Sequence, residues 1–140
     1  MHRAFSRFIA AVLFLAALSA VPAFAGGDSP LFINMTSNDP HRALMAIGFG
    51  RSQMQRGHPL TIFLNDHGVL VASKKNAEAF AEHQAILAEV AAAGATVLVC
   101  PTCSKAFGVP VEDFCQGARL GNPDLTGGAL FKDDTVTLSW

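Results

Sequence analysis

The sequence predicts an α/β fold, a three-layer α/β/α sandwich with an open, mostly parallel sheet of about five strands. Three apolar segments rich in β-branched residues begin near residues 31, 60 and 96, and segments with helical periodicity fill the gaps between them. This alternation is typical of βαβ units. The segments are apolar throughout rather than at alternate positions, which indicates parallel strands covered on both faces of the sheet.

The first two strands are expected at "LFINMT" (31–36) and "LTIFLND" (60–66). The helix between them should begin at the N-cap Asp39, with Pro40 in its first turn, because aspartate caps helices well and proline suits their first position. Gly57 is a typical stop signal for this helix. A polar loop, "NDHG", should end the second strand.

The rest of the chain continues the same alternation. An amphipathic helix is expected over "NAEAFAEHQAILAEVAAAG" (76–94), with Phe80, Ile86, Leu87 and Val90 on or near one face. "TVLVC" (96–100) is the third strand, and a short helix should follow from about Pro101 to Phe107. The remaining expected elements are a helical turn or two in "VPVEDFCQGA", a short fourth strand in "ARLGN", a final helix in "PDLTGGALF" and a closing strand in "DTVTLSW".

The first 25 residues have the layout of a secretory signal peptide. Two arginines precede an apolar run from residue 8 to 21, and "AFA" (23–25) supplies a small-residue cleavage site. The run is about 14 residues long, which is short for a bilayer span, although an uncleaved anchor is the alternative. Cleavage after Ala25 would leave one domain, residues 26–140, in the periplasm or outside the cell.

The charge of this mature chain excludes some partners. Residues 26–140 contain 8 basic and 11 acidic side chains, a net charge of −3. Nucleic-acid and anionic-membrane binding both require a basic patch, so neither partner is expected once the leader is removed.

The most informative stretch is "TVLVCPTCSKAFGVP" (96–110). Cys100 ends a strand and Pro101 can begin a helix, so Cys100 should occupy the N-cap. A thiolate at that position is stabilised by free N–H groups and by the positive end of the helix dipole, which raises its reactive fraction at neutral pH. Cys103 lies one turn further on, close enough to attack a group carried by Cys100. The pattern therefore suggests a nucleophile and a resolving thiol.

The rest of the site should come from the carboxyl ends of the other strands, where parallel sheets place their ligands. Besides Cys100 and Cys103, the residues expected to line the pocket are Asn38, Asp66, His67 and Thr102. His67 could exchange a proton near neutral pH, and its alternative role is that of a solvated loop residue. Asp66 could instead stabilise a turn.

Other interpretations of the cysteines stay open. The pair could be half of a zinc site, but no second C-x-x-C follows. A thioredoxin-type dithiol carries its proline just before the second cysteine, whereas here the proline follows the first. An inert disulfide, or a metal site completed by His67 or Met35, is also possible. Cys115 is expected to be a small apolar residue on a buried helical face.

With these motifs, the sequence resembles the DsrE/DsrF-like sulfur-relay proteins, which include the TusD type, from about residue 30 to 140. The matching segments are "LFINMTSNDPHRALMAIGFG", "HPLTIFLNDHGV", "GATVLVCPTCSKAFGVPVEDFCQGARLGN" and "DDTVTLSW". The cysteine segment is the most specific. In the family a strand ends in a cysteine, and a short helix and a glycine-hydrophobic break follow, which Cys100, Gly108 and Val109 match.

The resemblance implies a five-stranded domain that assembles into a homotrimer or homohexamer. It also implies that Cys100 carries sulfur as a persulfide between donor and acceptor proteins or small sulfane-sulfur compounds, and that no metal, nucleotide or organic cofactor is required. Cys103 would be the resolving thiol of an exported member, although the relay proteins of the family act in the cytoplasm. The alternative is a non-catalytic binding or assembly module with a structural Cys100–Cys103 disulfide.

Overall fold

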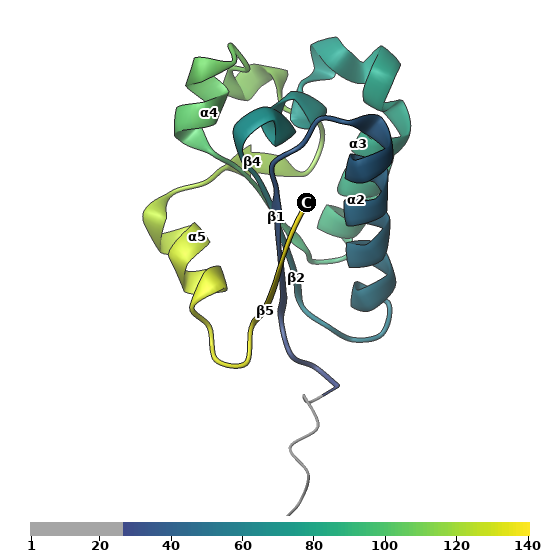
Figure 1. The fold of residues 1–140 in the computed structure, drawn as a ribbon, viewed down its shortest axis with the longest axis vertical. Coiled ribbons are helices and arrows are strands. Elements are labelled where there is room, and N and C mark those ends of the chain that lie inside the picture. The colour runs from purple at the N-terminus through teal and green to yellow at the C-terminus, as the bar shows by residue number, and fades with distance from the viewer. Residues whose placement is uncertain (1–26) are drawn as a thin grey trace, which may run out of the picture.

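A parallel five-stranded sheet forms the centre of the computed structural model, which describes residues 27–140 (Figure 1). Its order is β4-β3-β2-β1-β5, and every neighbouring pair is parallel. The predicted fold class is therefore confirmed, whereas the expected signal peptide lies outside the described residues. The strands are β1 (Leu31–Met35), β2 (Leu60–Leu64), β3 (Thr96–Val99), β4 (Ala118–Leu120) and β5 (Val136–Ser139).

Two long helices cover one face of the sheet, and a short helix lies on the other. Figure 1 shows α2 (Pro40–Met54) and α3 (Ala77–Ala92) side by side on one side of the strands, and α5 (Pro123–Leu130) on the opposite side. The six-residue α4 (Pro101–Ala106) lies at the end of the sheet that the carboxyl ends of β1, β2 and β3 share. No helix in the described part of the chain has the length and apolar character needed to cross a membrane.

The main core lies between the sheet and the α2–α3 layer. The four residues predicted for the apolar face of α3 are all buried. On α2, the small residues Ala43, Ala46 and Gly50 allow close approach: a Cβ on Gly50 would lie only 2.8 Å from Ile33 Cδ1. Burying one large aliphatic side chain in such a layer contributes about 1.5–3 kcal/mol to the free energy of unfolding. The apolar strands and the helix faces thus account for the layered fold.

The helix boundaries also follow local chemistry. The Asp39 carboxylate accepts the Arg42 N–H at 2.8 Å and caps α2, as predicted. Asn122 caps α5 in the same way through the Leu125 N–H, also at 2.8 Å. Gly57 ends the turn after α2 with a φ of +100°, a conformation that favours glycine.

Two expectations about local structure were wrong. The segment expected as the loop "NDHG" begins a 3₁₀ helix, η1 (Asp66–Ala72), because Gly68 lets the chain fold closely over the end of β1. Cys115 is buried, but it does not lie on a helical face. It follows the 3₁₀ turn η3 (Val111–Asp113), and its N–H donates to the Ala72 carbonyl at 2.7 Å.

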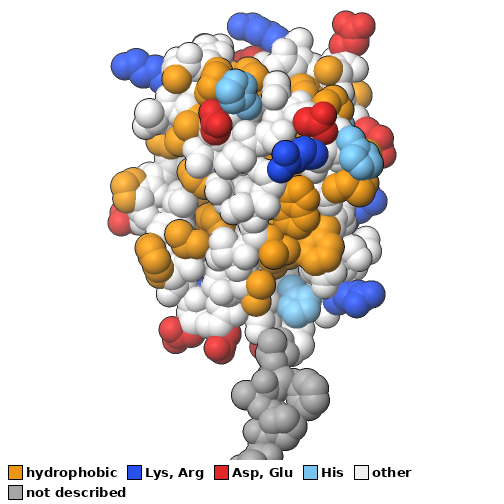
Figure 2. All heavy atoms as spheres, in the orientation of Figure 1, with side chains coloured by type: hydrophobic (Ala, Val, Ile, Leu, Met, Phe, Trp, Pro, Cys, Tyr) orange, Lys and Arg blue, Asp and Glu red, His pale blue; other side chains and the backbone are white. Residues whose placement is uncertain are grey.

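Apolar side chains remain exposed on the edge of the sheet. Strand β5 is the last of the sheet, and Val136 is 46% exposed. Figure 2 shows hydrophobic side chains gathered where β5 passes α2. There the rings of Phe49 and Trp140 lie 5.9 Å apart, beside a hollow lined by Val136 and Leu138. We call Phe49, Val136, Leu138 and Trp140 the β5-edge patch.

Replacement of Gly68 by alanine should destabilise the domain. A Cβ at this position would lie 2.2 Å from the Met35 carbonyl oxygen, so η1 or the end of β1 would have to move. We expect the free energy of unfolding in urea to fall by about 1–3 kcal/mol or more.

Gly48→Ala is the matched control. Gly48 lies within α2, and no neighbouring side chain or element lies within 4 Å of the position that an alanine methyl group would occupy. Alanine should therefore raise the free energy of unfolding by about 0.5–1 kcal/mol through its better helix propensity. Equal stability changes for the two variants would contradict the close approach of η1 to β1.

Candidate functional site

Cys100 forms the N-cap of α4, as the sequence predicts. It directly follows β3, its backbone is extended, and Pro101 is the first residue of the helix. The Cys100 sulfur accepts the N–H of Cys103 at 3.5 Å, and its carbonyl accepts the Ser104 N–H at 2.8 Å. Cys100 is half-buried at the carboxyl end of β3.

Cys100 is a weaker cap than the oxygen side chains used elsewhere in the chain. Like α4, helices α2 and α5 begin with proline, and their caps Asp39 and Asn122 accept at 2.8 Å. Sulfur is a weak acceptor, and an effective N-cap oxygen typically stabilises a helix by about 1 kcal/mol. As the N-cap of α4, Cys100 therefore stabilises the helix less than an oxygen side chain at the same position would.

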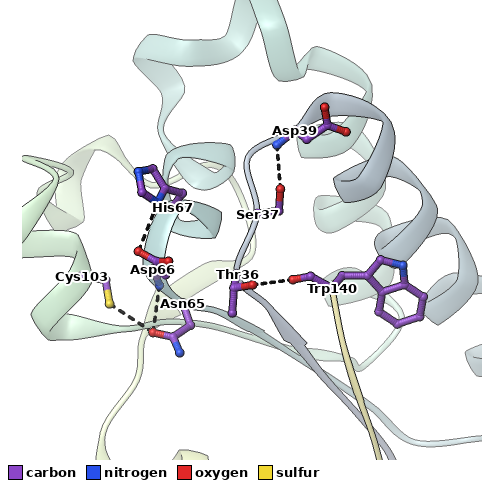
Figure 3. A network of polar contacts seen from close by, with 8 residues as sticks. All are labelled: Thr36, Ser37, Asp39, Asn65, Asp66, His67, Cys103 and Trp140. Atoms are coloured by element: carbon purple, nitrogen blue, oxygen red, sulfur yellow. Dashed lines mark hydrogen bonds and ion pairs between the residues drawn. The ribbon is translucent and has the colours of Figure 1, made fainter.

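The second thiol of the motif has a defined partner. Cys103 Sγ donates to Asn65 Oδ1 at 3.1 Å, and Asn65 is the residue that directly follows β2 (Figure 3). The site therefore joins the ends of β2 and β3. All three cysteines of the chain are free thiols in the structure.

Asn65 is held by backbone and side-chain contacts. Its N–H donates to the Met35 carbonyl at 2.9 Å, which continues the hydrogen-bond ladder beyond β2. Its side-chain Oδ1 accepts the N–H of Asp66 at 2.9 Å and caps η1 (Figure 3). Asp66 has a φ of +48°, which aspartate tolerates better than most residues. The Gly68 N–H then donates to the Thr36 carbonyl at 3.2 Å, which ties η1 to the end of β1.

Asp66 and His67 lie beside the thiols, at the start of η1. Their side chains are more than half exposed and approach each other at 3.2 Å, between Nδ1 and Oδ1. The His67 ring also packs against Phe107, the C-cap residue of α4, with 4.6 Å between ring centroids. This contact joins the start of η1 to the C-terminal end of α4, so the two segments that carry the site touch at a second point besides the Cys103–Asn65 hydrogen bond.

The other predicted pocket residues lie differently. Thr102 is exposed in the first turn of α4. Asn38 lines a separate hollow with Leu70 and Lys75, and neither cysteine of the motif lines it. Sequence reasoning did not include Asn65 among the pocket residues. The only signal for it was its place at the carboxyl end of an expected strand.

The environments of the thiols differ. Burial raises the pKa of Cys103, and a hydrogen bond with Cys100 raises it further, although the Asp66 N–H acts in the opposite direction. Burial raises the pKa of Cys115 to about 11. Cys103 and Cys115 are therefore both held more firmly as neutral thiols than an exposed cysteine would be.

An apolar groove adjoins α4 on the side of β4. It has a volume of about 430 Å³, and its walls include Pro101, Val109, Val111 and Leu120, with Lys105 beside them. Val111 and Leu120 are exposed. No group of three histidine, cysteine, aspartate or glutamate side chains suited to hold a metal ion occurs within residues 27–140. Met35, considered above as a metal ligand, is fully buried in the core.

Comparison with known proteins places most of the described chain in one family. A model of the DsrE/DsrF-like family matches residues 30–136. Two relatives are described as uncharacterized proteins. MJ0989 of Methanocaldococcus jannaschii is 35% identical over 98 residues, which are 69% of this chain and 86% of the relative. MK0008 of Methanopyrus kandleri is 34% identical over 97 residues, which are 68% of this chain and 80% of the relative.

A solved structure supports the fold alone. The protein of unknown function MTH1491 from Methanobacterium thermoautotrophicum superposes with a TM-score of 0.66 at 16% identity. The superposition covers 81% of this chain and all of that one.

The three thiols should alkylate in the order Cys100, Cys103, Cys115. The Cys100 sulfur accepts an N–H, whereas Cys103 donates its proton and has a raised pKa. Cys115 is 5% exposed and ionises only as the pH approaches about 11, so it should stay unlabelled at mildly alkaline pH until the protein unfolds. Peptide mapping after timed iodoacetamide treatment measures the order. Equal labelling of Cys115 in the native and the denatured protein would contradict the structure.

Proposed function

The chain belongs to the DsrE/DsrF-like family, and we propose that it is an exported sulfur carrier that holds sulfane sulfur as a persulfide on Cys100. The observation that carries this proposal is the sulfur cap of α4. Two other proline-initiated helices of the chain use oxygen caps at 2.8 Å, whereas α4 uses a cysteine at 3.5 Å. A residue that caps poorly at the end of a parallel sheet, where ligands gather, is better explained by its chemistry than by stability.

The reaction needs only a thiolate and a donor. The Cys100 thiolate attacks the outer sulfur of a donor persulfide, R–S–SH. A new S–S bond forms on Cys100, the S–S bond of the donor breaks, and its electron pair leaves with R–S⁻. The product is Cys100–S–SH. Transfer to an acceptor thiolate is the same exchange in reverse, so neither half needs an oxidant or a reductant.

Donor and acceptor proteins have a surface to contact beside Cys100. Pro101, the residue after Cys100, lines the apolar groove next to α4, and Val111 and Leu120 are exposed in it. Exposed apolar surface beside a reactive group is typical of a protein-docking site. Small sulfane-sulfur compounds are the other class of donor. Export rests on the layout of residues 1–25, so the carrier would act in the periplasm or outside the cell.

Replacement of Cys100 by serine should abolish sulfur uptake without unfolding the protein, because serine is a good N-cap residue. After reduction and treatment with polysulfide, the intact mass of the wild-type protein should rise by about 32 Da, one sulfur atom. Cys100→Ser should show no gain, and its free energy of unfolding should equal or exceed that of the wild type. Cys115→Ser serves as the matched control and should still gain the sulfur.

The same spectra test the alternative function, a non-catalytic binding module with a structural disulfide. In that case the wild-type mass would lack two hydrogens, mild reductant would not restore them, and polysulfide would add nothing. That result would overturn the proposed carrier function.

We also propose that the chain assembles into a homotrimer or homohexamer through the β5-edge patch. Phe49 on α2 is 42% exposed there, and Val136 on β5, the last strand of the sheet, is 46% exposed. An edge strand with exposed apolar neighbours is a ready surface for a second copy of the chain.

Phe49→Ser should reduce the molar mass measured by light scattering to that of one chain. Phe131 on the other side of the sheet is 82% exposed, and Phe131→Ser is the matched control that should leave the assembly intact. A monomeric wild-type protein would contradict the assembly, and dissociation by Phe131→Ser alone would contradict its location.

A further inference from the structure

We propose that Asn65 is a positioning residue that keeps Cys103 in its neutral thiol form and so protects a persulfide on Cys100 from premature release. This inference rests on the proposed carrier function. It concerns a side reaction that the two-thiol motif allows. A thiol one helical turn away, Cys103, can attack the persulfide on Cys100 that a carrier must preserve.

The competing reaction is a balanced exchange. The Cys103 thiolate attacks the inner sulfur of Cys100–S–SH, a Cys100–Cys103 disulfide forms, and HS⁻ leaves with the electron pair of the broken S–S bond. The sulfur is then lost as sulfide, and an external dithiol must reduce the protein before it can be loaded again. A carrier that hands sulfur to a partner therefore has to keep Cys103 from ionising while Cys100 is loaded.

The orientation of the Asn65 amide places its oxygen against Cys103. The N–H of Asp66 can only donate, and it lies 2.9 Å from Asn65 Oδ1, so the oxygen and not the amide nitrogen occupies that position. The same oxygen lies 3.1 Å from Cys103 Sγ. The sulfur of Cys103 thus faces an acceptor and has to supply the proton of this hydrogen bond (Figure 3).

Backbone geometry holds this arrangement in place. Asn65 is tied to β1 through its N–H and the Met35 carbonyl, and Cys103 is tied to Cys100 through its own N–H. Burial is the largest cause that raises the pKa of Cys103. The Cys100 thiol and the Asp66 carboxylate raise this pKa further, and the Asp66 N–H lowers it. The exposed His67 and Lys105 complete the titratable neighbours on η1 and α4. Among these neighbours, Asn65 is the one whose side-chain oxygen accepts the Cys103 S–H, at 3.1 Å.

The first experiment uses unloaded, reduced protein. Asn65→Ala removes the acceptor, and a hydrogen bond of ordinary strength corresponds to roughly a two- to tenfold change in the thiolate fraction. We expect the alkylation rate of Cys103 to rise by this factor while that of Cys100 stays unchanged. Asn65→Asp keeps an acceptor oxygen and adds a negative charge, which disfavours a second one nearby, so Cys103 should alkylate no faster than in the wild type. An unchanged rate in Asn65→Ala would overturn the proposal.

The second experiment follows the loaded protein by intact mass. The persulfide of Asn65→Ala should decay roughly two- to tenfold faster than that of the wild type, with matching release of sulfide and growth of the disulfide. Combining Asn65→Ala with Cys103→Ser should restore the lifetime. A merely structural role of Asn65 in capping η1 predicts instead that the lifetime stays short in the double variant, and that result would overturn the proposal.

The two experiments separate this inference from the function on which it rests. A wild-type protein that takes up no sulfur would refute the carrier function, and the alkylation rates of Cys103 would still decide the role of Asn65. If Asn65→Ala does not fold, Asn65→Asp tests the role of Asn65 instead. Faster alkylation of Cys103 in Asn65→Asp than in the wild type would contradict the proposal that the acceptor oxygen keeps Cys103 a neutral thiol.

Discussion

The candidate site depends on the parallel register of β1, β2 and β3. Met35 pairs with Leu64, and Leu64 pairs with Val99, so these three strands end level with one another. The next two residues continue the ladder, because the N–H groups of Asn65 and Cys100 donate to Met35 and Leu64 at 2.9 Å each. A slip of one residue would turn these side chains to the other face of the sheet and separate the two halves of the site. The proximity of Asn65 to the cysteine motif is therefore a consequence of backbone pairing.

Much of this arrangement could be predicted from the sequence. The spacing of apolar segments fixes the alternation of strands and helices, and "Cys-Pro" after a β-branched run places Cys100 at a helix N-cap at the carboxyl end of the sheet. These features follow from local rules about capping, proline and burial, which require no knowledge of distant contacts. The family resemblance could be recognised for the same reason, since its most specific motif lies within one continuous segment.

The partner of Cys103 could not be predicted in this way. Asn65 lies 38 positions away, and whether its oxygen faces Cys103 depends on the positive φ of Asp66 and on the close approach of Gly68 to β1. A polar residue after a strand has many possible orientations, and only the tertiary contact selects one. The same limit applies to Asn38, which also follows a strand but lines another hollow. Sequence position identifies which strand ends contribute to a site, whereas backbone conformation decides which side chains enter it.

Two thiols three residues apart can hold a transferable sulfur only when they differ in how readily they ionise. If both ionised equally, each would attack a sulfur held by the other, and the pair would collapse to a disulfide. The fold makes the difference from groups that are already present: a backbone N–H directed at Cys100 and an amide oxygen directed at Cys103. The second contact favours a neutral sulfur at Cys103, whose pKa is raised first of all by burial. A short helix whose N-cap is a cysteine, placed against the end of the neighbouring strand, thus suffices to give the two sulfurs different hydrogen-bond partners.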